Sequence, residues 1–265
     1  MMDKNNTNPI GFFDSGVGGL SVLARFREIL PNENVLYFGD TIHLPYGNKK
    51  QEELIGYAKN ILNFFESRNV KAVVIACNTS SAQAYDTVKD IYQFPIYPII
   101  QSCSKVIASS GFNRIGVFAT EATVKSGKYS QEIIKYNPEI RVKEMASKNW
   151  VGIVENSTDN IKDAKAQIRY EIEEMLSFNP DKIILGCTHY PYLMDEFVKY
   201  APKELFIDPA EIFVDFIKRD LTEKLLLNNN SFIGKEEFYV TSSPEDFVKN
   251  AKIFYNIKTL PIIYK

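Results

Sequence analysis

Two cysteines occupy matching positions in the chain and carry its most reactive side chains. Cys77 ends the apolar run AVVIAC, and Cys187 ends the run KIILGC. We expect each to open a helix, whose N-terminus stabilises a thiolate and lowers the thiol pKa from about 8.5. A single cysteine in this setting is more often a small buried hydrophobe. Two of them facing each other across a cleft suit proton removal from one face of a carbon and proton delivery to the other, which inverts that carbon.

A glycine-rich segment follows the first apolar run of the chain. It reads DSGVGGLS from Asp14 to Ser21 and matches neither the P-loop nor the GxGxxG spacing. Its glycines allow backbone N–H groups to approach an anion, and the helix expected after it adds positive potential. The Asp14 carboxylate suits an ammonium partner or a proton relay. An anion site beside a carboxylate indicates a zwitterionic ligand, which is an amino acid.

The histidines and the third cysteine limit the other chemistry. His189 lies two residues after Cys187 and either tunes that thiol or binds a carboxylate when protonated; a surface or capping role is the alternative. We interpret His43 as structural or peripheral and Cys103 as structural. With two histidines, no CxxC and no HExxH, the sequence predicts no metal site. Three cysteines without a secretion signal argue against a disulfide framework.

The elements that position these residues follow an α/β pattern. Short apolar runs alternate with amphipathic stretches, which is typical of parallel strands buried on both faces in a doubly wound sheet. Polar side chains follow many of the runs, where such sheets bind ligands, although Ser, Thr and Asp there also serve as helix caps. The predicted strands are 10–13, 35–39, 72–77, 96–100, 114–119, 182–187, 205–208 and 237–241.

The strand and cysteine runs recur at similar offsets. IGFF at Ile10 resembles IGVF at Ile115, and the segment around Cys77 resembles the one around Cys187. The repetition indicates two related lobes, each contributing a strand, a cysteine and a polar pair. The tail from about residue 210 is predicted to hold a helix, a strand and a last helix that begins after Ser243.

Composition excludes several classes of protein. The 265 residues contain 31 Lys plus Arg and 33 Asp plus Glu, so the net charge of −2 excludes strong non-specific nucleic-acid binding through overall charge. No run approaches the about 18 apolar residues that span a bilayer. The N-terminal stretch MMDKNNTNP lacks the apolar core of a signal peptide. We therefore expect a cytoplasmic protein with neither membrane nor nucleic acid as a partner.

Five segments together resemble one enzyme family. DSGVGGLSVL, YFGDTIHLPYG, ACNTSSA, GVFATEATVKSGKY and LGCTHYPYL occur in the order and spacing of the cofactor-independent glutamate racemases, within the aspartate/glutamate racemase superfamily. The resemblance covers about residues 10–255. It implies two similar doubly wound α/β domains with the active site in the cleft between them. The domains would be 1–98 with 210–265, and 99–209.

The resemblance also implies an activity and its residues. The protein would interconvert L- and D-glutamate without a cofactor, supply D-glutamate for peptidoglycan, cell-wall biogenesis and cell shape, and form a homodimer. Cys77 and Cys187 would be the two acid/base groups. Asp14 would assist Cys77, His189 would assist Cys187, and Glu155 would lie near the second cysteine. The residues implied to hold the substrate are Ser15, Tyr46, Gly47, Asn78, Thr79, Thr120, Thr123 and Thr188.

The sequence departs from the family in places and leaves alternatives open. Gln101-Ser102-Cys103 stands where many relatives have Glu-Pro-Gly, Ser147-Lys148 where many have Cys-Pro, and Ala119 where Gly is common. None of these changes removes a residue assigned to proton transfer. An aspartate racemase of the same superfamily, a Cys–His–Asp amidohydrolase and a non-catalytic amino-acid-binding module are the alternatives.

Overall fold

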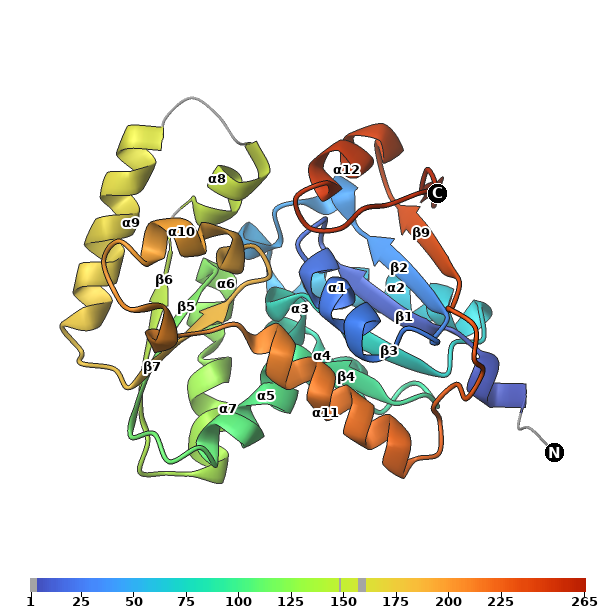
Figure 1. Cartoon of the computed structure of the whole chain (residues 1–265), viewed down its shortest axis with the longest axis horizontal. Coiled ribbons are helices and arrows are strands. Elements are labelled where there is room, and N and C mark those ends of the chain that lie inside the picture. The colour runs from blue at the N-terminus through green and yellow to red at the C-terminus, as the bar shows by residue number, and fades with distance from the viewer. Residues whose placement is uncertain (1–3, 148, 157–160) are drawn as a thin grey trace.

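The described strands form two sheets in which every pairing is parallel. The structure is a computed structural model and describes residues 4–147, 149–156 and 161–265 (Figure 1). The α/β class predicted from the sequence is confirmed, with strands at the centre and helices packed around them. Lys148, one of the departures from the family, lies outside the described residues.

The first sheet is built from both ends of the chain. Its strand order is β10-β9-β2-β1-β3-β4. The order places the C-terminal strands beside strands from the beginning of the sequence, and Figure 1 shows the red β9 next to the blue β2. The strands are β1 (Ile10–Asp14), β2 (Val35–Gly39), β3 (Ala72–Ile75), β4 (Ile96–Pro98), β9 (Glu236–Val240) and β10 (Ile262–Ile263).

The second sheet is built from the middle of the chain. Its order is β6-β5-β7-β8, with β5 (Arg114–Ala119), β6 (Arg141–Ala146), β7 (Lys182–Gly186) and β8 (Phe206–Ile207). In both sheets the first strand of the segment lies inside the sheet, flanked by later strands. The central strands β1 and β2 are buried along their whole length, and so is β5 after Arg114. This burial explains their continuous apolar runs.

Helices connect the strands and cover the sheets. The prediction that residues 96–100 form one strand is wrong beyond Pro98, because a helix begins at Ile99. The α-helices are α1 (Leu20–Ile29), α2 (Gln51–Ser67), α3 (Asn78–Gln83), α4 (Tyr85–Val88), α5 (Ile99–Ala108), α6 (Glu121–Ser126), α7 (Lys128–Tyr136), α8 (Trp150–Asn156), α9 (Ile161–Leu176), α10 (Met194–Phe197), α11 (Pro209–Glu223) and α12 (Pro244–Ala251). Short 3-10 turns are η1 (Lys4–Thr7), η2 (Thr41–His43), η3 (Tyr46–Asn48), η4 (Tyr190–Leu193) and η5 (Lys203–Leu205).

The alternation of side chains along the strands divides the core. Phe13, Phe38 and Ile75 face one side of the first sheet and pack in one cluster with residues of α2 such as Phe65. Their neighbours, such as Phe12, face the other side and join α1, α5, α11 and the second sheet in one large cluster. The helices α5 and α11 pack on each other where the chain crosses between the sheets. The two sheets therefore share a continuous apolar core, which fixes the site between them.

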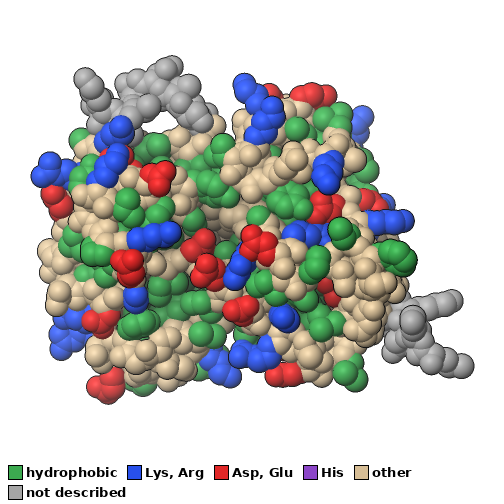
Figure 2. Space-filling view, in the orientation of Figure 1, with side chains coloured by type: hydrophobic (Ala, Val, Ile, Leu, Met, Phe, Trp, Pro, Cys, Tyr) green, Lys and Arg blue, Asp and Glu red, His purple; other side chains and the backbone are tan. Residues whose placement is uncertain are grey.

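The surface view shows mixed charges. On the face drawn in Figure 2, basic and acidic side chains are interspersed over both halves of the molecule. Interspersed charges give this face no large field of one sign. Within the described residues, no helix has both the length and the apolar character that crossing a membrane requires.

Candidate active site

A cavity of about 660 Å³ lies at the carboxyl ends of strands from both sheets. Ser15 follows β1 and Cys77 follows β3 of the first sheet, while Thr120 follows β5 and Cys187 follows β7 of the second. Parallel α/β sheets bind ligands at this edge. The predicted residues that line the cavity are Ser15, Tyr46, Gly47, Cys77, Asn78, Thr79, Thr120, Glu155, Cys187, Thr188 and His189. Asp14 and Thr123 lie behind it.

Cys77 is the N-cap residue of α3, as the sequence analysis expected. Its sulfur accepts a hydrogen bond from the backbone N–H of Ser80 over 3.4 Å. The expected lowering of its pKa is wrong. Burial, together with the nearby Asp14 carboxylate, raises the pKa of Cys77 to about 12, and the Ser80 N–H offsets this only in part. The charge of Cys187 also raises it, because the two sulfurs face the same cavity. Cys77 is therefore a protonated thiol at neutral pH.

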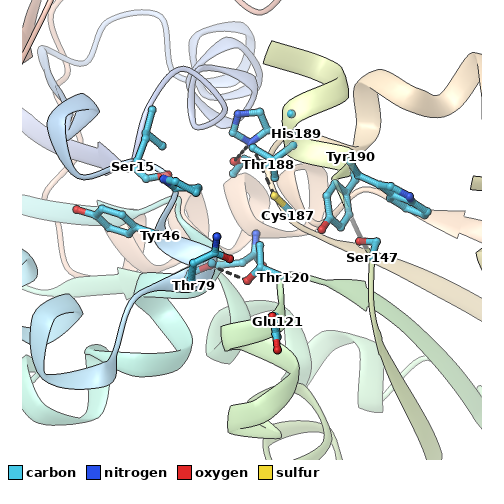
Figure 3. Close-up of a pocket in the computed structure, with 18 of the residues that line it drawn as sticks. Ser15, Tyr46, Thr79, Thr120, Glu121, Ser147, Cys187, Thr188, His189 and Tyr190 are labelled. Atoms are coloured by element: carbon cyan, nitrogen blue, oxygen red, sulfur yellow. Dashed lines mark hydrogen bonds between the residues drawn. The ribbon is translucent and has the colours of Figure 1, made fainter. Parts of the chain in front are cut away.

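Cys187 lies in a turn, and the prediction that it opens a helix directly is wrong. Its carbonyl accepts from the N–H of Tyr190, where the short η4 begins with a proline at its start. Figure 3 shows Cys187, Thr188 and His189 together at one wall of the cavity. His189 Nδ1 lies 3.7 Å from the Cys187 sulfur, and His189 Nε2 lies 3.0 Å from Glu155 Oε1. These contacts form a chain from thiol to imidazole to carboxylate.

The imidazole in this chain is held in its charged form. Burial alone lowers the pKa of His189, but hydrogen bonds to Cys187 and Glu155 and the charge of Asp14 outweigh burial. The pKa of His189 is raised to about 10. An imidazolium beside a sulfur is the kind of cationic partner that stabilises a thiolate.

Asp14 is buried beneath the glycine-rich turn rather than in the cavity. Its Oδ2 accepts from the N–H of Gly16 over 3.1 Å, and the N–H of Gly19 also points to this carboxylate. The anion that these N–H groups hold is thus Asp14 itself, which corrects the expectation of a free anion site there. Burial raises the pKa of Asp14, while His189 and the two N–H groups work against that rise. Thr188 Oγ1 lies 3.5 Å from Asp14 Oδ1 and links it to the Cys187 turn.

Glycine at position 18 allows the two sheets' loops to meet. A Cβ atom there would lie 2.4 Å from Thr188 Oγ1 and 2.5 Å from His189 Cε1. Such contacts are impossible without displacement of the Cys187 turn. The glycine-rich segment therefore serves close packing against the second cysteine.

Three threonines join the sheets at the cavity. Thr79 Oγ1 on α3 and Thr120 Oγ1, the N-cap of α6, lie 2.9 Å apart (Figure 3). Thr123 is fully buried, 3.0 Å from Thr120, and supports this contact from behind. Gly47 contributes its backbone beside them, because a Cβ there would lie 3.1 Å from Thr120 Cβ.

Tyr46 presents its ring and backbone to the cavity, while its hydroxyl group points elsewhere. The hydroxyl donates to Asp40, which also accepts from Thr241 and lies 2.8 Å from His43 Nδ1. Burial and the Asp40 carboxylate raise the pKa of Tyr46 well above its usual value. Any contact of Tyr46 with a ligand is thus made by its backbone or ring face. Asp40 was missed, although it directly follows a predicted strand and the strand-end rule points to it.

Two buried N–H donors remain for a ligand. Asn78 accepts from the Tyr129 hydroxyl over 2.7 Å through Oδ1, but its Nδ2 has no partner among the described residues. The indole Nε1 of Trp150 is likewise buried without a hydrogen-bond partner among the described residues. Buried polar groups are nearly always paired, so these atoms indicate where a polar ligand binds. The cavity is also lined by residues to which the sequence assigns no role, namely Leu44, Pro45, Asn48, Glu121, Ala146, Asn149, Trp150, Val151, Gly152 and Tyr190.

The lining carries acids, hydroxyls, amides and thiols. In the parts of the chain that the structure describes, no group of three or more His, Cys, Asp or Glu side chains is arranged to hold a metal ion. The charged side chains at the cavity include Glu121, Glu155 and His189. A carboxylate ligand would therefore be held mostly by neutral donors.

Known proteins share both the sequence and this architecture. The family model described as Asp/Glu/Hydantoin racemase matches residues 19–217. The chain belongs to this racemase family. A glutamate racemase of Carboxydothermus hydrogenoformans is 39% identical over 96% of this chain and 94% of its own, and one of Picosynechococcus is 37% identical over 95% and 90%. As a member, the protein is an enzyme, an isomerase of the racemase class.

Solved racemase structures agree over nearly the whole chain. The glutamate racemase of Francisella tularensis, solved with D-glutamate, has a TM-score of 0.87 at 33% identity. The RacE1 isoform of Bacillus anthracis has a TM-score of 0.92 at 27% identity. Each comparison covers 98% of both chains. The two-sheet arrangement around the cavity is therefore that of the racemase family.

Proposed function

We propose that this racemase interconverts L- and D-glutamate, with Cys77 and Cys187 as the two acid/base groups. The observation that carries the proposal is that both thiols line one cavity, Cys77 after a strand of the first sheet and Cys187 after a strand of the second. The relatives named glutamate racemase and the solved complex with D-glutamate support the choice of substrate.

The protonated forms of Cys77 and His189 support different roles for the two cysteines in each direction of the reaction. Cys77 begins as a thiol, and we assign the proton-removing role to Cys187, whose sulfur lies 3.7 Å from Nδ1 of the His189 imidazolium. The Cys187 thiolate removes the α-proton, and Cys77 delivers its own proton to the opposite face of the carbanion. Cys187 is then protonated and Cys77 ionised, so the reverse reaction uses the same groups in exchanged roles. General acid/base groups placed this way contribute about 10²–10⁴-fold each.

The carbanion needs donors at the α-carboxylate, because we propose that no cofactor takes up its charge. Preorganised donors in a water-poor site are worth about 3–4 kcal/mol each. The unpartnered Nδ2 of Asn78 and Nε1 of Trp150 are the buried candidates. The hydroxyl groups of Ser15, Thr79 and Thr188 also line the cavity.

The wider role follows from the product. D-Glutamate is a building block of bacterial peptidoglycan, so we propose that the enzyme serves cell-wall precursor synthesis in the cytoplasm and acts as a homodimer. We also propose that residues 1–98 with 210–265 form one domain and 99–209 the other. The cavity would then lie between the domains.

Isotope exchange tests the activity. Metal-free, pyridoxal-free protein is incubated with L-glutamate in D₂O, and optical rotation and α-deuteration are followed together. We expect rotation to fall to zero while deuterium enters the α-position. A greater turnover of L-aspartate would favour the aspartate racemase alternative. Hydrolysis without α-exchange would indicate an amidohydrolase, and ligand-induced stabilisation without loss of rotation would indicate a binding module.

The cysteine assignment has its own test. Cys77→Ala and Cys187→Ala each remove one of the two groups, so each is expected to abolish racemisation in both directions. Cys103→Ala is the matched control, because Cys103 lies buried on α5 with its sulfur 3.4 Å from the Pro209 carbonyl oxygen. Normal turnover in either of the first two variants would refute the two-base assignment.

A further inference from the structure

A second, smaller cavity touches the active site at Glu155. It has a volume of about 200 Å³ and lies between the loop that follows β2 and the start of α12, with Thr41, Ser242, Asp246 and Asn250 in its lining. Glu155 and Leu44 line both this cavity and the larger one. One water takes about 30 Å³, so there is room for several waters. We call it the outer cavity.

Glu155 connects the outer cavity to a thiol. Its side chain is 21% exposed, whereas His189, 3.0 Å away, is only 3% exposed. The other nitrogen of His189 lies 3.7 Å from the Cys187 sulfur. Cys187 itself is buried. Three titratable groups therefore form a continuous path from a buried sulfur to a polar cavity.

The reaction proposed above creates a need for such a path. Each turnover moves the substrate's α-proton onto one sulfur and takes a proton from the other. Before the next turnover in the same direction, the first sulfur must lose its proton and the second must regain one. The sum over a turnover is one proton released and one taken up, with no oxidant or reductant involved.

We propose that Cys187 exchanges its proton with solvent through His189, Glu155 and the outer cavity, a proposal that rests on the function given above. The His189 imidazolium first releases its Nε2 proton to Glu155, whose carboxylate passes it to water. Exchange with water in the outer cavity then leaves the remaining ring proton on Nε2, so Nδ1 is free to accept the thiol proton, and this restores the imidazolium–thiolate pair. Asp14 reaches the same path, because Thr188 Oγ1 lies 3.5 Å from both Asp14 Oδ1 and His189 Nδ1. Through Thr188, Asp14 is therefore connected to the same proton path.

A variant that fills the outer cavity tests the route. Asn250→Phe places a large apolar side chain in its lining, and Asn250 does not line the substrate cavity. Lys249→Phe is the matched control, since Lys249 is an exposed neighbour on α12 outside both linings. Slowing the return of the sulfurs to their starting protonation states between turnovers lowers kcat. It leaves kcat/KM unchanged, because kcat/KM describes the reaction of substrate with enzyme that is already correctly protonated. For Asn250→Phe we expect kcat to fall about tenfold, less than the about 10²–10⁴-fold that a positioned proton-transfer group itself contributes, because Glu155 and His189 stay in place.

Chemical rescue gives an independent readout. Glu155→Ala should lower kcat and regain activity with added formate, which enters the outer cavity in place of the carboxylate. The Glu155→Ala, Asn250→Phe double variant should show no rescue. Three results would overturn the route. The first is an equal kcat in Asn250→Phe and Lys249→Phe, and the second is a fall of kcat/KM in Asn250→Phe. The third is rescue of the double variant by formate. Absence of α-deuteration in the unmodified enzyme would instead overturn the proposed function.

Discussion

His189 keeps its proton in surroundings that would otherwise remove it. Its pKa of about 10 lies above the usual value near 6.5 for histidine, because the partners at both ring nitrogens outweigh burial. A raised pKa stabilises the folded state most fully below the unfolded value of about 6.5. That contribution is lost as the pH rises through about 10. The same proton is the partner of the Cys187 sulfur, so stability and activity depend on it together.

The pH profile of the enzyme tests this assignment. We expect activity to fall on the alkaline side with an apparent pKa near 10 in the unmodified protein. Glu155→Gln removes one of the contacts that raise the pKa of His189, so its alkaline limb should move toward neutral pH. The measurement is kcat/KM against pH, with the His189 ring signals followed by NMR. An unshifted limb in Glu155→Gln would show that Glu155 does not hold the proton on His189.

The elements position these residues through close contacts between loops. Gly18, two residues before α1, is the clearest case, because Thr188 and His189 leave no room for a Cβ there. The turn after β7 therefore takes its position from a loop of the other sheet. Sequence alone shows the glycine but not its partner.

A methyl group at Gly18 tests the contact. Gly18→Ala should push the Cys187 turn away, and a displacement of about 1 Å costs on the order of 10² in activity. Gly56→Ala is the control, because a Cβ at Gly56 in α2 would meet no atom within 4 Å. That control should keep full activity and gain about 0.5–1 kcal/mol in unfolding free energy. Comparable kcat/KM values for the two variants would contradict the packing role.

The sequence predicts buried elements well and exposed ones poorly. The strands expected at 35–39 and 114–119 have these bounds in the structure, because continuous apolar runs are required inside a parallel sheet. The strand at 141–146 was missed, since its RVKEMA sequence is charged and half-exposed at an edge. The two-residue β10 is exposed and too short to leave a pattern.

The candidate site was predictable in its residues but not in its hydrogen bonds. Polar residues after apolar runs pointed to Cys77, Thr120 and Cys187, which all line the cavity. That the glycine-loop amides hold Asp14, and that Tyr46 donates to Asp40, depends on atoms brought together by the tertiary fold. Residue types and spacing carry no record of such pairings.

At the scale of the molecule, a buried ion pair joins distant segments at the amino ends of β2 and β3. Lys71 Nζ and Glu33 Oε2 lie 2.6 Å apart, with side chains 1% and 2% exposed. Lys71 also donates to the carbonyl groups of Asn6 and Leu226, and Glu33 accepts from the N–H of Asn228. Four stretches of chain meet at this cluster.

Removing the lysine should be costly. Lys71→Met leaves Glu33 as an uncompensated buried charge, and breaking such a pair costs about 3–5 kcal/mol of unfolding free energy. Lys105→Met on the exposed face of α5 is the matched control, with an expected change within about 0.5 kcal/mol. Urea denaturation of both variants measures the difference. Equal midpoints would mean that the cluster contributes little.

The strand order of the first sheet affects how a new chain folds. β2 is complete by residue 39, yet its neighbour β9 begins only at Glu236. During synthesis one edge of the strand VLYFG therefore stays unpaired until β9 has been made. The strands of the second sheet, in contrast, are all made within residues 114–207. A bare apolar edge is a template for pairing with other chains, and late long-range pairing prolongs that exposure. Chains that end before Glu236 thus keep an unpaired, aggregation-prone strand edge. Synthesis of β9 covers this edge and so protects the molecule from aggregation.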